Sequence, residues 1–414
     1  MADTYQLALR PQWPSLINLD WSEPLERWPA AAFVDLPRGI SRHTVRFCEV
    51  DGSLFALKEL PQRAAQRDYA GLRRLEDLGG SAVRAVGLVT REGDPDRETA
   101  AVLITRYADY SFSYRELLSG EGFGKRRTQL LDAFAFLLVE LHLLGCFWGD
   151  CSLSNTLYRY DAGAIETLLV DAETSELHEH LSRGQREYDV EIMRLNVGGE
   201  MGDIAASRGL TLDDADLALG DDIAGRYQAL WKELAGDQRL PADAAQYKVE
   251  ERVQRLNDLG FEVDDITVEP APDHGQLRLG VRIADRHFHS NRLRRLTGVE
   301  ASEHQARQIL SDLSYYEMKK TAAGSRRSAA GKALLAARWR AEEFEPRLKL
   351  LAEHLPPGAD PVQAYTDVLH HRYMLSVGAG RDVGTEAAFK HWLADGRPGY
   401  PLPASPEAIR VARP

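Results

Sequence analysis

The first third of the chain alternates between β-type and helix-type hydrophobic patterns. Two β-rich runs, "VDLPRGISRHTVRFCEV" and "SLFALKEL", flank Asp51–Gly52, a dipeptide typical of tight hairpin turns. A helix is predicted between Pro61 and Gly79–Gly80, because leucines recur at helical spacing between the proline and the glycines. Two more strand-type runs follow, "AVRAVGLVT" and "TAAVLITRY". The pattern therefore predicts a hairpin, a helix and two further strands.

The pattern becomes mainly helical after residue 110. Leu130–Trp148 is nearly long enough to cross a bilayer, but it contains an Asp, a Glu and a His, which are costly in hydrocarbon. We therefore expect a buried helix over Leu130–Leu144. A second hairpin is predicted around Asp161–Gly163. Residues 176–222 are rich in Asp and Glu, which is typical of a solvated surface.

The remainder suggests further folded parts separated by polar joints. Residues 245–320 read as helix, two strands and helix, and residues 333–395 as wholly helical. The N-terminal segment, rich in Trp and Pro, is expected to pack Trp13, Trp21 and Trp28 onto a folded body. The predicted parts are a lead-in, two lobes, a small α/β domain and a helical tail, at residues 1–34, 35–110, 111–237, 245–320 and 333–414.

Composition narrows the class of protein. The 414 residues are 44% hydrophobic and 28% charged, with a net charge of −12, which argues against a protein that coats nucleic acid through its overall charge. The three cysteines form no CxxC pair and no disulfide framework, and the N-terminus does not read as a signal peptide. These features indicate a cytoplasmic protein, and they leave the oligomeric state open.

Four residues carry the candidate chemistry. The run "GDCSLSN" places Asp150 five residues before Asn155, "LLVDAE" ends an apolar strand with Asp171, and "FALKEL" puts Lys58 on the second strand of the first hairpin. Phosphoryl transfer needs a carboxylate to orient the attacking group, ligands for a metal and a cation on the phosphates. By these roles Asp150 and Lys58 are the candidate catalytic residues, and Asn155 and Asp171 are the candidate Mg²⁺ ligands.

These motifs resemble those of the protein-kinase-like superfamily, and more closely those of the lipopolysaccharide (Kdo) kinase-type proteins. Within that group the chain is similar to a bacterial family of unknown function with an added C-terminal domain. The stretches "FWGDCSLSNTLYR", "LITRYADYSFSYRELL", "RLNDLGFEVD" and "AGRDVGTEAA" carry the resemblance. It implies an α+β, bilobal kinase-like fold with a C-terminal α/β domain and helical tail. It also implies ATP and Mg²⁺, with transfer of the γ-phosphoryl group to a hydroxyl of an acceptor that it does not identify.

The phosphate-binding loop departs from the kinase pattern. "LPRGISRHTVRF" contains the single glycine Gly39, so phosphate contacts would come from backbone amides and from Ser41, Arg42 and His43. The alternative is a plain β-turn. The acid that pairs with Lys58 is either Asp68 or Glu76, and the resemblance favours Asp68.

The regulatory neighbours of the motifs are also absent. Asp171 is followed by Ala172 and Glu173 instead of Phe-Gly, and Trp148-Gly149 replaces the usual His-Arg before Asp150. We therefore expect no activation-loop switch. The same departures keep a second class open, a pseudokinase-type nucleotide-binding scaffold or adaptor.

A basic cluster lies in the C-terminal half, within "RIADRHFHSNRLRRLTG". One interpretation is a site for an anionic ligand or nucleic acid at Arg286, Arg292, Arg294 and Arg295. A second is a face that packs against the acidic segment 176–222, and a third is a metal site at the His-x-His pair.

Overall fold

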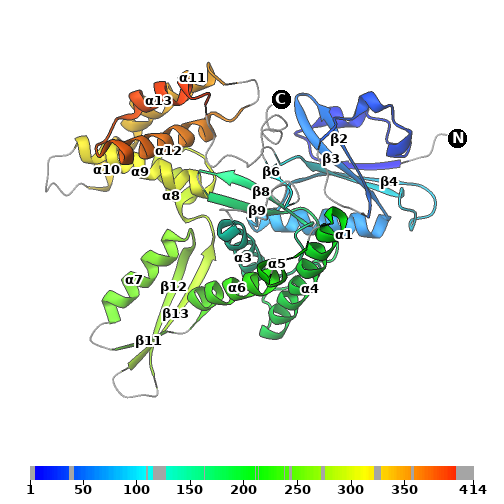
Figure 1. Cartoon of the computed structure of the whole chain (residues 1–414), viewed down its shortest axis with the longest axis horizontal. Helices are drawn as coiled ribbons and strands as arrows, with labels where there is room; N and C mark the ends of the chain where they lie inside the picture. Colours follow the sequence, from blue (N-terminus) through cyan, green and yellow to red (C-terminus); the bar gives the residue numbers. More distant parts are fainter. Residues whose placement is uncertain are drawn as a thin grey trace. The chain divides into compact units, whose positions relative to one another are not determined.

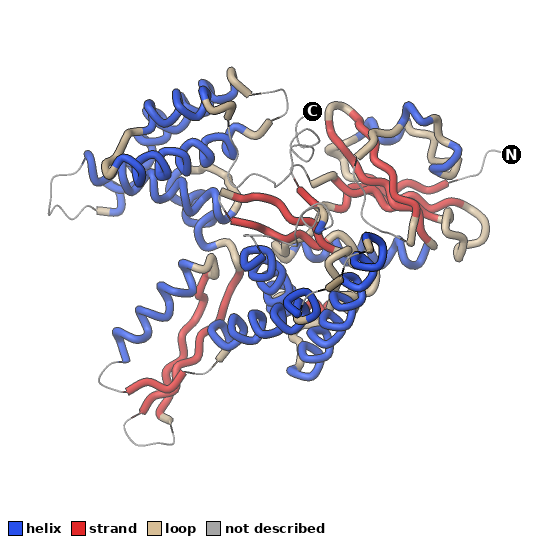
Figure 2. The backbone as a smooth tube through the Cα atoms, viewed as in Figure 1, coloured by secondary structure: helices blue, strands red, loops and turns tan. Residues whose placement is uncertain are grey.

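The structure is a computed structural model, and it divides into two compact units (Figures 1 and 2). Unit 1 comprises residues 1–159 and 166–230, and unit 2 comprises residues 160–165 and 231–414. The residues that the structure describes are 5–36, 42–108, 111–114, 127–162, 164–209, 211–212, 214–236, 238–241, 245–271, 276–320, 328–355 and 359–397.

Unit 1 begins with a five-stranded antiparallel sheet of order β1-β4-β5-β3-β2. The strands are β1 (Tyr5–Leu9), β2 (Thr44–Val50), β3 (Ser53–Leu60), β4 (Ala85–Arg91) and β5 (Ala101–Arg106). Helix α1 (Gln62–Asp77) packs against β3, β4 and β5 (Figure 1). The predicted order of hairpin, helix and two strands is confirmed, and Asp51 and Gly52 have the positive φ angles of the predicted turn.

The N-terminal segment is more than an extended lead-in. Its first strand, β1, pairs with β4 and completes the sheet. Three short 3-10 helices follow, η1 (Pro14–Asn18), η2 (Leu25–Arg27) and η3 (Ala30–Ala32). Trp21 and Trp28 are buried and Trp13 is partly buried against the same hydrophobic core, so the predicted packing of the tryptophans is confirmed. Sequence reading missed β1 because only five residues of it are regular.

The rest of unit 1 is mainly helical. The helices are α3 (Arg127–Leu143), α4 (Arg183–Arg208), α5 (Asp214–Leu217) and α6 (Leu219–Ala235), the last of which runs into unit 2. Two small sheets accompany them. One is formed by β6 (Ser111–Phe112), β8 (Thr156–Asp161) and β9 (Ala164–Leu169), of which residues 160–165 are assigned to unit 2, and the other by β7 (Cys146–Phe147) with β10 (Glu176–Leu177).

Helix α3 is the buried helix that the apolar run predicted. Eleven of its side chains are buried, and they lie on every side of the helix. Among the described helices, none is both long and apolar enough to span a bilayer.

Unit 2 contains a three-stranded antiparallel sheet of order β11-β13-β12 and a group of helices. The sheet and its helix are formed by β11 (Gln238–Pro241), α7 (Ala245–Asp258), β12 (Glu262–Pro270) and β13 (Gln276–Asp285). The remaining elements are α8 (Phe288–Thr297), α9 (Glu303–Lys320), α10 (Ala329–Trp339), the π-helical turn η6 (Arg340–Phe344), α11 (Glu345–Ala352), α12 (Pro361–Ala379) and α13 (Thr385–Ala394). Their shared core centres on Trp339, Tyr365 and Trp392. The predicted α+β class with a helical C-terminal region is confirmed.

Candidate active site

Lys58 lies among several carboxylates in unit 1. It projects from β3, and its Nζ lies 3.0 Å from Asp68 Oδ2 of α1 and 2.5 Å from Asp171 Oδ2, two residues beyond β9. Glu173 Oε2 is 3.6 Å from the same nitrogen. The Lys58 side chain is 13% exposed and that of Asp68 is fully buried. A strand, a helix and a loop that are distant in sequence therefore meet at one ammonium group.

Glu76, the alternative partner for Lys58, lies elsewhere. Its carboxylate pairs with Arg10 and with Arg84, the latter at 2.9 Å. Asp68 is the helix acid beside Lys58, and the shorter side chain still reaches the ammonium directly.

The charges in this cluster do not balance. Burial alone would lower the pKa of Lys58, but the charges of Asp68 and Asp171 outweigh it and raise that pKa. Burial and the charge of Asp171 raise the pKa of Asp68 to about 6, against the opposing effects of Lys58 and of the Ala172 amide. Lys58 thus serves two carboxylates, those of Asp68 and Asp171, and an excess of carboxylate oxygens suits a hard divalent cation.

Asp171 is positioned by hydrogen bonds at the end of β9. The Leu169 amide donates to the Ser81 carbonyl at 3.0 Å, and the Val83 amide donates to the Leu169 carbonyl at 2.9 Å. These two bonds tie β9 to the segment that leads into β4. Asp171 follows two residues later, where its carboxylate meets Lys58.

Asp150 is fixed by two asparagines. The Asn155 side-chain amide donates to Asp150 Oδ2 at 2.9 Å and to the Asp150 carbonyl at 3.1 Å. The Asn196 side-chain amide, from α4, donates to Asp150 Oδ1 at 3.0 Å. The structure therefore brings Asp150 and Asn155 together as the motif predicts. Asn196 was missed, because an asparagine inside a helix gives no local signal of a distant partner.

Asp189, also on α4, holds the backbone before Asp150. Its side chain is completely buried. The carboxylate accepts hydrogen bonds from the amides of Trp148 and Gly149, at 2.7 and 2.9 Å, and from Cys151 Sγ at 3.2 Å. The expectation that the acids of 176–222 form a solvated face is therefore wrong at this position.

His142 of α3 completes the surroundings of Asp189. Its Nε2 lies 3.0 Å from Asp189 Oδ2, and its Nδ1 lies 2.7 Å from the Tyr227 hydroxyl. Burial lowers the pKa of His142 although Asp189 opposes this. A neutral imidazole with the proton on Nε2 fits both contacts, since a carboxylate only accepts hydrogen bonds.

Glu200 supports the far side of the same loop. Its carboxylate accepts hydrogen bonds from the amides of Leu153 and Ser154, each at 2.8 Å. Burial raises the pKa of Glu200 despite these bonds. Two acids of α4 thus hold the loop on either side of Asp150, and neither was identified from the sequence.

A cavity of about 570 Å³ lies over these residues, within the range of ordinary ligand sites. One part of its lining is apolar and comes from β2, β3, β8 and the residue before Asp171, namely Val45, Ala56, Leu157 and Val170. Another part is polar and contains Lys58, Asp150, Asn155 and Asp171. These apolar residues, referred to as the apolar slot, and the charged residues of the same lining together suit a planar base joined to phosphates.

The predicted phosphate loop is only partly described. Gly39 and Ser41 lie outside the described residues. Arg42 lines the cavity and is exposed, and its guanidinium pairs with Glu173. Glu173 is itself buried and also lies 3.5 Å from His43 Nε2. Glu173, which stands where the kinase pattern has its glycine, thus has Lys58, Arg42 and His43 as neighbours.

The residues predicted to hold Mg²⁺ fit that ion in chemistry. Asp171 supplies carboxylate oxygens, with Oδ1 accepting the Glu173 amide at 3.1 Å. Asn155 uses its amide nitrogen on Asp150, which leaves its carbonyl oxygen as the group to offer a metal. Both side chains line the cavity, and oxygen ligands are those that Mg²⁺ prefers.

The basic cluster of unit 2 is divided between a strand and a helix. Arg295 pairs with Glu262 at 3.0 Å, and Arg282 pairs with Asp264 at 2.8 Å, so acids of β12 neutralise part of it. Arg292 and Arg294 are exposed on α8. His289 is buried, with Nδ1 2.6 Å from Glu303, which occupies one nitrogen of the His-x-His pair.

Comparisons with known proteins match two segments of the chain. Residues 45–199 match the lipopolysaccharide kinase (Kdo/WaaP) family, and residues 229–396 match a domain of unknown function (DUF4032). A search of curated proteins found no match.

Solved structures that resemble the chain include kinases. WaaP in complex with acyl carrier protein is 15% identical, with a TM-score of 0.36 over 60% of this chain and 98% of that one. The Rio2 kinase–ADP/Mg²⁺–phosphoaspartate complex from Chaetomium thermophilum is 13% identical, with a TM-score of 0.31 over 49% of this chain and 70% of that one. Residues 45–199 of the chain thus resemble the lipopolysaccharide kinase (Kdo/WaaP) family, and residues 229–396 resemble DUF4032.

Proposed function

We propose that unit 1 is an ATP- and Mg²⁺-dependent phosphotransferase that transfers the γ-phosphoryl group to a hydroxyl. The observation that carries the proposal is the convergence of Lys58, Asp150 and Asp171 on one cavity that also has an apolar slot. The family match of residues 45–199 supports a kinase-type activity. Phosphoryl transfer relies mainly on positioning and charge stabilisation, and this site supplies both.

In this proposal each polar residue has one task. Lys58, held by Asp68, binds the α- and β-phosphates, and the apolar slot receives the adenine. Asp150, fixed by Asn155 and Asn196, orients the acceptor hydroxyl and takes its proton. Asn155 and Asp171 would hold Mg²⁺, which neutralises charge on the phosphates when it is bound.

The acceptor side of the cavity is acidic. Glu200 and Asp203 of α4 line it near Asp150, together with the polar Asn196 and the backbone of Gly199. A polyanionic acceptor would be repelled by these carboxylates, at about 1 kcal/mol or more for each charge within several ångströms. We therefore propose a neutral or cationic hydroxyl compound as the acceptor.

The test is ATP turnover and phosphotransfer by the whole chain and by two variants, Asp150→Asn and Asp171→Asn. Asp150→Asn should retain Mg·ATP binding but lose at least about 100-fold in kcat, because it removes the base and leaves the nucleotide contacts. Asp171→Asn should weaken Mg·ATP binding. Glu191→Gln, an exposed acid on α4, is the control. If Asp171→Asn binds Mg·ATP as well as the wild type, the proposal is wrong.

The contacts of Glu173 support the alternative, a pseudokinase-type scaffold. Glu173 places a buried carboxylate 3.6 Å from Lys58 Nζ and pairs with Arg42, so two cations near the phosphate end already have an anionic partner. In a pseudokinase-type scaffold these pairs would persist. Nucleotide binding without any phosphotransfer to water or to sugars, peptides and small alcohols would favour that alternative.

Three expectations drawn from the sequence remain predictions. They are the division into five parts, the anionic ligand at Arg286, Arg292, Arg294 and Arg295, and a cytoplasmic location. The last accords with three cysteines that are all buried free thiols.

A further inference from the structure

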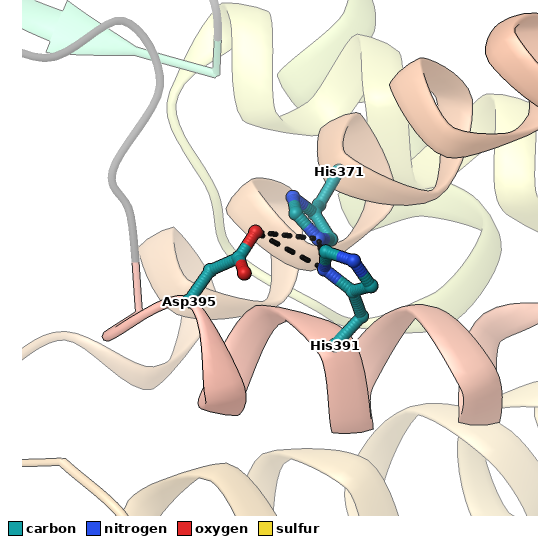
Figure 3. Close-up of side chains that lie close together, drawn as sticks. All are labelled: His371, His391 and Asp395. Carbon is teal, nitrogen blue, oxygen red and sulfur yellow. Dashed lines mark hydrogen bonds and ion pairs between the residues drawn. The ribbon is translucent and has the colours of Figure 1, made fainter.

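Three side chains with metal-binding atoms converge at the C-terminal end of unit 2 (Figure 3). His371 belongs to α12, whereas His391 and Asp395 lie at the end of α13. His391 Nδ1 lies 3.0 Å from His371 Nε2 and 3.0 Å from Asp395 Oδ2, and the remaining separation, His371 Nε2 to Asp395 Oδ2, is 3.9 Å. Among the described residues, this is the one group of at least three His, Cys, Asp or Glu side chains spaced to share an ion.

The fold holds this arrangement in place. His391 and Asp395 are four residues apart and so share one face of the helix end, where the Asp395 amide donates to the His391 carbonyl at 2.9 Å. Trp392, between them in sequence, is buried in the core that α12 and α13 share. Packing of the two helices therefore brings His371 opposite the other two side chains.

Hydrogen bonding alone does not satisfy both neighbours of His391 Nδ1. The Nδ1 atom of a histidine has one in-plane position, which carries either a proton or a lone pair. At His391 this single position faces both the His371 nitrogen and the Asp395 oxygen. If Nδ1 carries a lone pair, it repels the carboxylate. If it carries a proton, that proton must be shared between two acceptors. A cation among the three atoms would satisfy all of them at once.

The spacing is also that of a metal site. With bonds of about 2.0–2.2 Å, two ligands of a tetrahedral Zn²⁺ lie about 3.3 Å apart. Two of the observed separations, both 3.0 Å, are shorter than that value, and the third, 3.9 Å, is longer. We propose that His371, His391 and Asp395 bind a divalent transition metal of the Zn²⁺ class and so clamp α13 to α12. Two imidazoles favour such a metal over Mg²⁺ or Ca²⁺.

The three proposed ligands differ in their exposure to solvent. The His371 side chain is 4% exposed, whereas those of His391 and Asp395 are 50% and 47% exposed. An ion would therefore be anchored from the interior and open to solvent on its other side. Three protein ligands leave a fourth position for water, and an exchangeable ion of this kind would stabilise the helix pair when bound.

The experiment uses the full chain with Co²⁺ and then Zn²⁺ as probes. Co²⁺ bound by two histidines and a carboxylate should give visible ligand-field absorption, and Zn²⁺ should displace it. His391→Ala and Asp395→Asn, both at exposed positions, should each weaken binding by at least about tenfold, since each removes a direct ligand. Zn²⁺ should raise the thermal midpoint of the wild type relative to EDTA, and this rise should vanish in both variants.

Two controls separate this site from others. His354→Ala removes an exposed histidine of the same unit and should leave the Co²⁺ spectrum unchanged. Asp171→Asn alters the proposed Mg²⁺ site of unit 1 and should also leave it unchanged, so failure of either proposal can be recognised. If the wild type gives no such spectrum and no Zn²⁺-dependent shift at about 100 µM metal, or if His391→Ala binds as the wild type does, the metal site is refuted.

Discussion

Asp189 offers the sharpest test of how the candidate active site is held together. Its Oδ2 accepts hydrogen bonds from the Trp148 amide and from His142 Nε2, and its Oδ1 accepts from the Gly149 amide and from Cys151 Sγ. Replacement by Asn keeps the shape and exchanges one oxygen for an NH₂ group. In either orientation of the amide, one backbone amide, that of Trp148 or that of Gly149, then faces another donor, whereas the His142 ring and the Cys151 thiol can each become the acceptor.

The cost follows from that lost bond. A buried donor without a partner costs about 1–3 kcal/mol, a sizeable part of a typical domain stability of about 5–15 kcal/mol. At about 2 kcal/mol the folded-to-unfolded ratio of unit 1 falls by about 30-fold. The amides of Trp148 and Gly149 should also exchange faster with solvent, because their acceptor is weakened.

Three measurements on the Asp189→Asn variant test this prediction. Urea unfolding reports the stability of unit 1, hydrogen exchange of the peptide around Trp148 reports the loop, and phosphotransfer kinetics report the site. We expect kcat to fall by at least about 100-fold with a smaller change in Mg·ATP affinity, because the loop moves while Lys58 and Asp171 keep their places.

Glu191→Gln is the matched control, since it removes an exposed acid from the same helix. Its effect on stability should stay within about 0.5 kcal/mol. If Asp189→Asn unfolds at the same urea concentration as Glu191→Gln and shows the same exchange near Trp148, the carboxylate does not hold the loop.

Two further perturbations test the charges. Glu173→Gln removes a carboxylate that lies 3.6 Å from Lys58 Nζ. It should tighten nucleotide binding, measured by calorimetry, about fivefold, because about 1 kcal/mol of repulsion between this carboxylate and the phosphates is relieved. Unchanged or weaker binding would contradict this. Burial alone would raise the pKa of Glu303, but hydrogen bonds from the His289 ring and from the amides of Ser290 and His289 lower it. Because the folded pKa lies below the unfolded one, this stabilisation is present at neutral pH and is lost as the pH falls through the folded pKa. Glu303→Gln should therefore destabilise unit 2 by about 2 kcal/mol at pH 7 and flatten the acid limb of its stability curve; a limb as steep as that of the wild type would be the contrary result.

The sequence predicted those parts of the site that depend on local context. Lys58 lies on a strand with a clear hairpin signal, and Asp171 follows an apolar strand, so both were recognisable from their surroundings. Asp150 and Asn155 have a fixed spacing, and the structure joins them by a hydrogen bond. Asp68 could be chosen over Glu76 only by resemblance, because both lie one turn from the same leucine.

The positioning residues were beyond local reading. Asn196 and Asp189 lie within an acidic stretch whose composition indicates a solvated surface, and the composition is the same whether a given acid faces water or the interior. Their roles depend on how α4 packs beneath the loop, which is tertiary information. The strand β1 was missed for a related reason: five residues of it pair with β4, about 80 residues later in the chain.

Three carboxylates of the chain, unlike Asn196, accept hydrogen bonds from backbone amides. Asp189 accepts the amides of Trp148 and Gly149, Glu200 accepts those of Leu153 and Ser154, and Glu303 accepts those of His289 and Ser290. Every residue type except proline has a backbone N–H group, so the partner's residue type gives no sign of such a contact in the sequence. Part of the acidity of this chain, with its net charge of −12, therefore holds loops in place rather than solvating the surface. A buried carboxylate is costly unless its oxygens are bonded, and these acids meet that need while holding backbone: Asp189 and Glu200 at the Asp150 loop, and Glu303 at the first turn of α8.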